Sequence, residues 1–228
     1  KWDINTGILS GDAMLIQAYR YFEEYESDLF KPLLQLFSKT AQQVCEGQQY
    51  DVDFEERDNV SIPEYLHMIE YKTAVLVAAA LQMGSIIAGA DRENQLRIYQ
   101  FGLNLGIAFQ LQDDYLDAFG DPKTFGKKVG GDIAENKKTF LYLKALELAK
   151  PNEAQQMQHL YSLQPEDDTA KIENAKQIFK ESGAAKASAE AIEKYTQIAF
   201  DNLNKLNISD QHQKNFTDFG NWLMNRER

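Results

Sequence analysis

Three aspartates close an otherwise apolar stretch of the chain. In residues 109–121, FQLQDDYLDAFGD, the acids Asp113, Asp114 and Asp117 follow directly on apolar residues. On a helix, Asp113 and Asp117 lie one turn apart on one face, and Asp114 lies about 100° round from Asp113. Carboxylates this close repel one another unless a cation neutralises them, and oxygen ligands of this kind suit Mg²⁺ shared with a substrate phosphate. A solvated helix end explains the same pattern, so the acids alone leave both interpretations open.

Lysines after the acidic stretch are a second chemical feature. Lys127 and Lys128 lie in FGKKVGGD, and Lys137 and Lys138 lie in NKKT. A glycine-flanked lysine loop beside a metal-binding acidic face can hold a diphosphate from both sides. An ordinary surface loop has the same composition, so this feature by itself does not decide.

Lys72, followed by Thr73, interrupts an apolar helical segment at residues 65–90. A buried lysine without a partner is costly, so Lys72 requires an anion nearby. Glu70 and a bound phosphate are the two alternatives, and the sequence does not separate them.

Composition excludes several classes of function. The net charge of −11 leaves no basic surface for a nucleic-acid backbone, so no nucleic-acid partner is expected. The longest strongly apolar run, residues 74–81, is too short to cross a bilayer, so no integral membrane segment is expected. The single cysteine, Cys45, rules out an intrachain disulfide and favours a reducing compartment such as the cytoplasm.

The spacing of apolar residues predicts an all-α fold in one domain, residues 1–228. Ser61, Pro63 and Glu64 form a helix-start pattern with a capping box. A polar connection is expected at residues 46–59, and a Gly- and Lys-rich loop at residues 120–132. Helices are expected at residues 8–25, 29–44, 65–90, 92–119, 139–150, 166–182, 184–204 and 216–225.

Residues 109–139 as a whole resemble the second aspartate-rich region of the trans-isoprenyl (polyprenyl) diphosphate synthases, of the farnesyl and geranylgeranyl diphosphate synthase type. GDAML at residues 11–15, GQQYD at 47–51 and YKTA at 71–74 resemble further segments of that family in order and spacing. The resemblance spans most of residues 7–140. It implies the isoprenoid synthase fold, a bundle of long antiparallel helices around a central cavity.

This resemblance implies a prenyltransferase of isoprenoid biosynthesis. The partners would be isopentenyl diphosphate and an allylic prenyl diphosphate, the cofactor Mg²⁺, and the assembly a homodimer. By position in the motifs, the implied metal-binding acids are Asp113, Asp114 and Asp117. The implied diphosphate-binding lysines are Lys72, Lys127 and Lys137. Thr73 and Gln110 match groups whose oxygens face the cationic carbon. Gln48 and Asp51 match the GQxxD positions near the metal or Lys72, and Asp132 matches an acid that holds Lys127 or Lys137.

The family's first DDxxD motif, with the Arg pair after it and the Gly-Gly-Lys segment before it, does not occur in the chain. These segments would lie upstream of Lys1, which favours a fragment of a longer enzyme over a shortened relative. A catalytically inactive or regulatory subunit of a prenyl synthase heteromer is the alternative function. The resemblance assigns control of product chain length to residues just before the first DDxxD motif. A terpene cyclase is disfavoured, because Lys171 stands where the motif beginning at Asp167 requires Ser or Thr.

Overall fold

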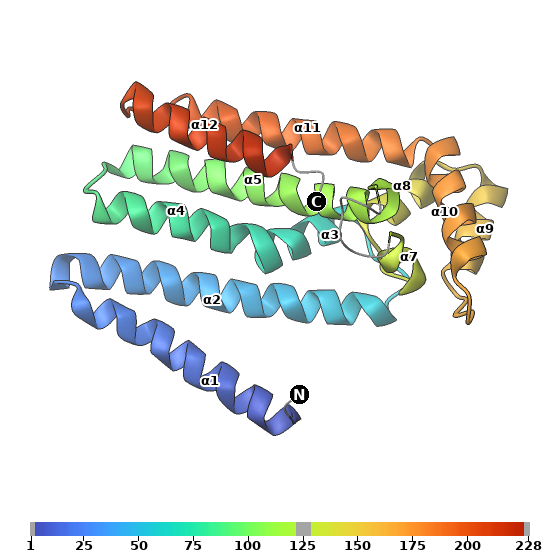
Figure 1. The fold of residues 1–228 in the computed structure, drawn as a ribbon, viewed down its shortest axis with the longest axis horizontal. Helices are drawn as coiled ribbons and strands as arrows, with labels where there is room; N and C mark the ends of the chain where they lie inside the picture. The colour runs from blue at the N-terminus through green and yellow to red at the C-terminus, as the bar shows by residue number, and fades with distance from the viewer. Residues whose placement is uncertain (1–2, 122–128, 226–228) are drawn as a thin grey trace.

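The chain folds into a bundle of long, roughly antiparallel helices (Figure 1). This computed structural model describes residues 3–121 and 129–225, and no strand occurs among them. The predicted all-α class is therefore confirmed, whereas the single domain over residues 1–228 stays a prediction. The elements are α1 (Ile4–Arg20), η1 (Tyr21–Glu24), α2 (Ser27–Glu56), α3 (Ile62–Ile69), η2 (Glu70–Ala74), α4 (Val75–Ile87), α5 (Arg92–Phe119), α7 (Gly131–Ala134), α8 (Phe140–Leu148), α9 (Pro151–Leu160), α10 (Thr169–Glu181), α11 (Ala184–Leu203) and α12 (Asp210–Met224).

Helix α5 lies at the centre, with α4 along one side and α11 along the other (Figure 1). Its residues Phe101, Leu105 and Ala108 are completely buried. Gly106 allows the close approach of the end of η2, because a Cβ there would lie only 2.7 Å from the Cα of Ala74. The core therefore holds α5 rigidly along its length and fixes the position of the acids near its C-terminal end.

The predicted connection at residues 46–59 is wrong, because α2 continues without a break to Glu56. The buried residues of α2 are Leu33, Thr40, Gly47 and Phe54. They are seven residues apart, so they lie on one face that packs against the rest of the bundle. Most of the polar residues between them are exposed, whereas Asp51 is half-buried. Composition suggested a connection, whereas this seven-residue repeat indicated a helix.

The segment predicted as one helix over residues 65–90 contains a break in regularity. It starts at the expected capping box, in which the Ser61 backbone N–H donates to Glu64 Oε2 at 2.9 Å. The turn η2, Glu70–Ala74, is π-helical, and regular α-helix resumes with α4. A π turn inserts an extra residue and changes the direction in which its side chains project. It contains both Lys72 and Thr73.

The C-terminal helices α8–α10 pack around the end of the bundle where α5 finishes (Figure 1). Helix α9 was not predicted, although Pro151 in its first turn and Glu153 bonded back to the Lys150 N–H are ordinary start signals. Helix α12 starts at Asp210 rather than residue 216, because Ser209 caps it by accepting the His212 N–H. The first turns of both helices are polar, so the spacing of apolar residues did not reveal where these helices begin.

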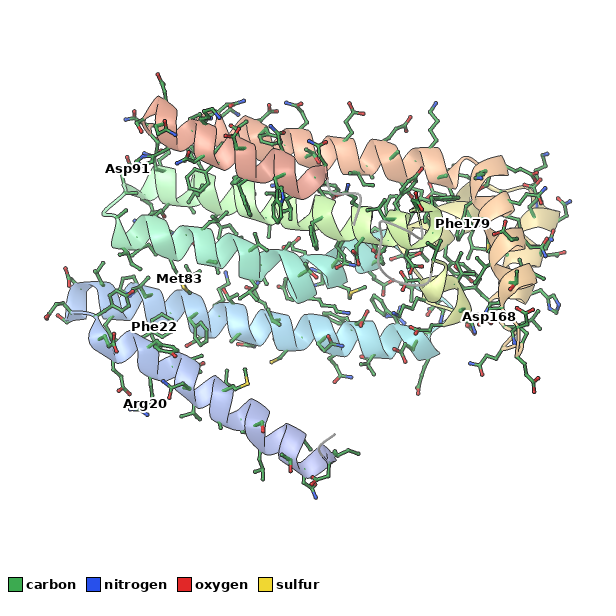
Figure 2. All side chains as sticks on the ribbon, in the orientation of Figure 1. Arg20, Phe22, Met83, Asp91, Asp168 and Phe179 are labelled. Atoms are coloured by element: carbon green, nitrogen blue, oxygen red, sulfur yellow. The ribbon has the colours of Figure 1, made fainter. Side chains whose placement is uncertain are left out.

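Helix α1 diverges from the bundle, and η1 turns the chain from it into α2 (Figure 1). Phe22 lies at this junction (Figure 2). The centroid of its ring is 5.0 Å from that of Phe37. Ile4, Leu9 and Met14 on α1 remain largely exposed. Within residues 3–121 and 129–225, no helix combines the length and apolar character needed to cross a membrane.

Candidate active site

A cavity of about 300 Å³ opens where the C-terminal ends of α2 and α5 meet α3, η2 and the segment from α7 to α8. It brings together most of the candidate residues, although they are distributed over almost ninety positions of the chain. Its lining comprises Asp51, Phe54, Glu55, Tyr65, Met68, Ile69, Lys72, Gln110, Asp113, Asp114, Asp117, Asp132, Lys137, Lys138 and Thr139. Thr73 adjoins it through a hydrogen bond to Gln110. Gln48 lies on the exposed side of α2, and Lys127 lies outside the described residues.

The three aspartates of α5 do not have equal environments. Asp113 and Asp117 are partly exposed at the cavity, whereas Asp114 is 7% exposed. Both carboxylate oxygens of Asp114 accept hydrogen bonds, Oδ2 from the Tyr65 hydroxyl and Oδ1 from Gln110 Nε2 at 3.0 Å. Burial, together with the nearby charge of Asp132, raises the pKa of Asp114 to about 7.

Asp117 connects α5 to the segment that follows the Gly- and Lys-rich stretch. Its Oδ2 accepts the backbone N–H of Asp132 at 3.0 Å, and its carbonyl accepts the N–H of Gly130 at 2.6 Å. Burial and the charge of Asp132 raise the pKa of Asp117 to about 6. These bonds fix Asp132 and the start of α7 against the acidic face.

Lys72 finds its anion on α2. Its Nζ lies 2.5 Å from Asp51 Oδ2, and Gln48 Nε2 donates to the same oxygen at 3.4 Å. Asp51 was not one of the two expected partners, and the continuous α2 helix brings it beside η2. A bound phosphate as a further partner of Lys72 stays a prediction. Of the two expected positions for Gln48 and Asp51, the structure supports the one near Lys72. The Lys72 side chain is 35% exposed, so its ammonium group remains accessible from the cavity.

Lys137 and Lys138 have different surroundings. Lys137 Nζ lies 3.1 Å from Asp132 Oδ1 and 2.9 Å from Glu135 Oε2, which is the expected pairing of Asp132 with Lys137. Burial opposes its charge, but these two carboxylates prevail and raise the pKa of Lys137. Lys138 Nζ instead donates to the backbone carbonyls of Phe54 and Glu55, both at 3.0 Å, at the C-terminal end of α2. A cation at a helix C-terminus stabilises that end, so Lys138 closes the cavity wall.

Acids on one wall and paired lysines on the others form a polar cavity suited to an anion accompanied by a divalent cation. The Polyprenyl synthetase family matches residues 1–179 of the chain. The chain belongs to this family. The resemblance seen in the aspartate-rich region is thereby confirmed over most of the sequence.

Individual members of the polyprenyl synthetase family agree with this. The short chain isoprenyl diphosphate synthase of Methanothermobacter thermautotrophicus is 34% identical over 213 residues, which are 93% of this chain and 65% of that protein. The chain therefore spans less than two-thirds of that relative. A crystal structure of a geranylgeranyl pyrophosphate synthase matches with 56% identity and a TM-score of 0.93, covering 100% of this chain and 70% of that one. The bundle is thus the fold of a prenyl diphosphate synthase, as predicted.

A further polyprenyl synthetase relative bears on the metal. A geranylgeranyl pyrophosphate synthase from Corynebacterium glutamicum, complexed with isoprenyl diphosphate and magnesium, is 25% identical with a TM-score of 0.87, covering 98% of this chain and 64% of that one. Among the described residues here, no three His, Cys, Asp or Glu side chains gather closely enough to ligate one ion. Mg²⁺ commonly uses only one or two carboxylates and completes its shell with phosphate oxygens and water. Asp113 and Asp117, both at the cavity, fit a Mg²⁺ shared with a diphosphate.

Tyr65 is the residue of this site that the sequence reasoning missed. It is 2% exposed, lines the cavity and donates to Asp114. Burial, followed by the charge of Asp114, raises its pKa well above the ordinary value. A usable signal existed, because Tyr65 precedes Lys72 by seven residues and so lies near the same helix face two turns earlier.

Proposed function

We propose that the chain contributes the substrate-binding cavity described above to a trans-prenyltransferase, which condenses isopentenyl diphosphate with an allylic diphosphate and yields a longer trans-prenyl diphosphate. The observation that carries this proposal is the cavity itself. It combines Asp113 and Asp117 with Lys72 and Lys137 in a chain of the polyprenyl synthetase family. The surrounding charges are those that a diphosphate leaving group requires.

The lysines bind and neutralise diphosphate oxygens. Lys72 and Lys137 are already held at the cavity by Asp51 and Asp132, so little side-chain ordering remains to be done when an anion binds. Asp113 and Asp117 would hold Mg²⁺, which supplies positive charge to the departing diphosphate. Lys127, outside the described residues, is proposed as a third diphosphate-binding lysine.

The reaction breaks the allylic C–O bond and releases diphosphate. The double bond of isopentenyl diphosphate attacks the resulting allylic cation, a C–C bond forms, and a proton is lost to the released diphosphate. The side-chain oxygens of Gln110 and Thr73, joined by a 3.2 Å hydrogen bond, are proposed to face the cationic carbon. Met68 and Ile69, both buried in the cavity wall, help to exclude water from it.

We further propose a homodimer and a cytoplasmic location. The exposed apolar residues of α1, such as Leu9 and Met14, support a dimer because burial of such surface stabilises association. Cys45 is the single cysteine and is exposed, which fits a reducing compartment.

The test is chain elongation by the complete gene product. The protein is incubated with labelled isopentenyl diphosphate, Mg²⁺ and each of several allylic diphosphates, and products are separated by chain length. Mg²⁺-dependent formation of longer prenyl diphosphates is expected. Absence of product with every allylic substrate refutes the proposal, and retained Mg²⁺-dependent diphosphate binding in that case identifies the inactive subunit of a heteromer.

A further inference from the structure

We infer that Tyr65 is a positioning residue which acts through Asp114 to fix the orientation of the Gln110 side-chain amide. This inference rests on the proposed function for its catalytic consequence. It also separates Asp114 from the two acids at its sides. Asp113 and Asp117 line the cavity in which a metal would bind, whereas Asp114 serves as an internal anchor.

The inference starts from one continuous chain of hydrogen bonds. The Tyr65 hydroxyl on α3 donates to Asp114 Oδ2 on α5, and Gln110 Nε2, one turn earlier on α5, donates to Asp114 Oδ1 at 3.0 Å. The Thr73 hydroxyl on η2 then donates to Gln110 Oε1 at 3.2 Å. Three separate elements are therefore connected through a single amide group at the cavity.

The direction of this chain is set by Asp114. Both oxygens of Asp114 act as acceptors in this arrangement, so the end of the Gln110 amide that faces Asp114 is its NH₂ group. The carbonyl oxygen of Gln110 is then necessarily the end that faces Thr73. With the amide reversed, its NH₂ hydrogens would face Thr73 and the reacting carbon. An oxygen there stabilises a developing positive charge, whereas amide hydrogens oppose it.

Tyr65 holds Asp114 in the position from which it accepts the hydrogen bond of the Gln110 NH₂ group. Asp114 is 7% exposed, so water cannot readily replace a lost partner. Tyr65, itself 2% exposed, supplies the bond to the oxygen that Gln110 does not use. A buried carboxylate that loses one of two partners will rotate or take up a proton. Either change removes the fixed acceptor that orients Gln110.

Asp114 is poorly placed to act as a direct metal ligand in this arrangement. Both of its oxygens are engaged by protein groups, and its side chain is the most buried of the three acids of α5. A metal ion that bound Asp114 would compete with Tyr65 or Gln110 for the lone pairs of a buried carboxylate. The inference therefore predicts separate effects on Gln110 orientation and on metal–diphosphate binding.

The experiment compares Tyr65→Phe with Tyr161→Phe in the complete protein. Tyr161 is a matched control, because its hydroxyl is buried and has no hydrogen-bond partner within the described part of the chain. Three quantities are measured. They are the NMR signals of the Gln110 side-chain NH₂ in metal-free protein, the Mg²⁺-dependent affinity for pyrophosphate by calorimetry, and the kcat and KM of elongation. Gln110→Ala identifies the Gln110 signals.

For Tyr65→Phe we expect a shift in the NMR signals of the Gln110 NH₂ protons. We expect kcat to fall on the order of 10- to 100-fold, which is the range for residues that orient an active-site group. The pyrophosphate affinity should stay within about twofold of wild type. Tyr161→Phe should leave all three unchanged. Unshifted Gln110 signals, or a kcat equal to that of Tyr161→Phe, overturn the inference. A large loss of Mg²⁺–pyrophosphate affinity also overturns it, because Asp114 would then act on the metal. If the wild-type protein does not elongate, the proposed function fails, while the Gln110 signals still decide the positioning role.

Discussion

Replacing Gly47 with alanine should test how the GQQYD segment positions Lys72. Gly47 is buried on α2 directly beneath η2. A Cβ at this position would lie 2.3 Å from the backbone nitrogen of Lys72 and 2.7 Å from the carbonyl carbon of Tyr71. Both contacts are to backbone, which cannot rotate away as a flexible side chain can. The substitution should therefore push α2 and the lysine-bearing turn apart.

The magnitude follows from these distances. An ordinary contact of a Cβ begins near 3.4 Å, so the two segments must separate by roughly 1 Å before the repulsion is relieved. Overpacking of this kind costs about 1–3 kcal/mol. Alanine recovers about 0.5–1 kcal/mol relative to glycine in a helix interior. We expect a net loss in the free energy of unfolding of about 1–2 kcal/mol, with the melting temperature lowered by about 2–4 °C for each kcal/mol.

Thermal unfolding and pyrophosphate affinity together check this prediction. Gly84→Ala is the matched control, since Gly84 also lies within a helix but a Cβ there meets nothing within 4 Å. Gly84→Ala should be neutral or stabilising by up to about 1 kcal/mol. Gly47→Ala should also weaken Mg²⁺-dependent pyrophosphate binding, because Lys72 moves with its backbone. A Gly47→Ala protein as stable as Gly84→Ala, with unchanged pyrophosphate affinity, would refute the reasoning.

Three other predictions concern charge. Because the pKa values of Asp114 and Asp117 are raised to about 7 and about 6, the native state retains protons that the unfolded chain has released. The stability that these protons provide is fully present below about pH 4 and is lost as pH rises to about 7. Across this pH range, the free energy of unfolding measured with a chemical denaturant should decline more steeply for metal-free wild type than for Asp114→Asn. Equal slopes for the two proteins would contradict this prediction. Lys171 is 3% exposed and donates to three acceptors. Its replacement by methionine should lower the free energy of unfolding by about 2–3 kcal/mol, whereas the exposed Lys186 should tolerate the same change. Similar melting temperatures for the two variants would disprove the structural role of Lys171. Asp113→Ala should abolish Mg²⁺-dependent pyrophosphate binding and leave the circular dichroism spectrum unchanged, and full binding by this variant would exclude Asp113 as a metal ligand.

Much of the fold and most of the site could be predicted from local patterns. The capping box at Ser61 and the apolar stretch before Asp113 depend only on residues close in sequence, and the structure contains both elements. The i and i+4 spacing of Asp113 and Asp117 places both at one cavity. Lys72 and Lys137 stood out from their sequence surroundings, and the family motifs then assigned both to diphosphate binding.

The errors arose where contacts distant in sequence decide the structure. Polar composition at residues 46–59 concealed a helix whose burial depends on Gly47 packing against η2. Asp51 was not expected as a partner of Lys72 for the same reason, because it comes within reach only when that helix continues. The hydrogen bond of Tyr65 to Asp114 could not be read from the sequence, since the two residues are 49 positions apart. Backbone π geometry at η2 left no recognisable mark in the sequence.

The most direct test of the central claim is a crystal structure of the complete protein with Mn²⁺ in place of Mg²⁺ and an unreactive allylic thiodiphosphate. Anomalous scattering from manganese locates the metal without relying on its surroundings. The account predicts metal at Asp113 and Asp117, diphosphate oxygens in contact with Lys72 and Lys137, and Asp114 still bonded to Tyr65. Diphosphate bound outside this cavity, or metal ligated by Asp114 with the Tyr65 bond broken, would contradict it.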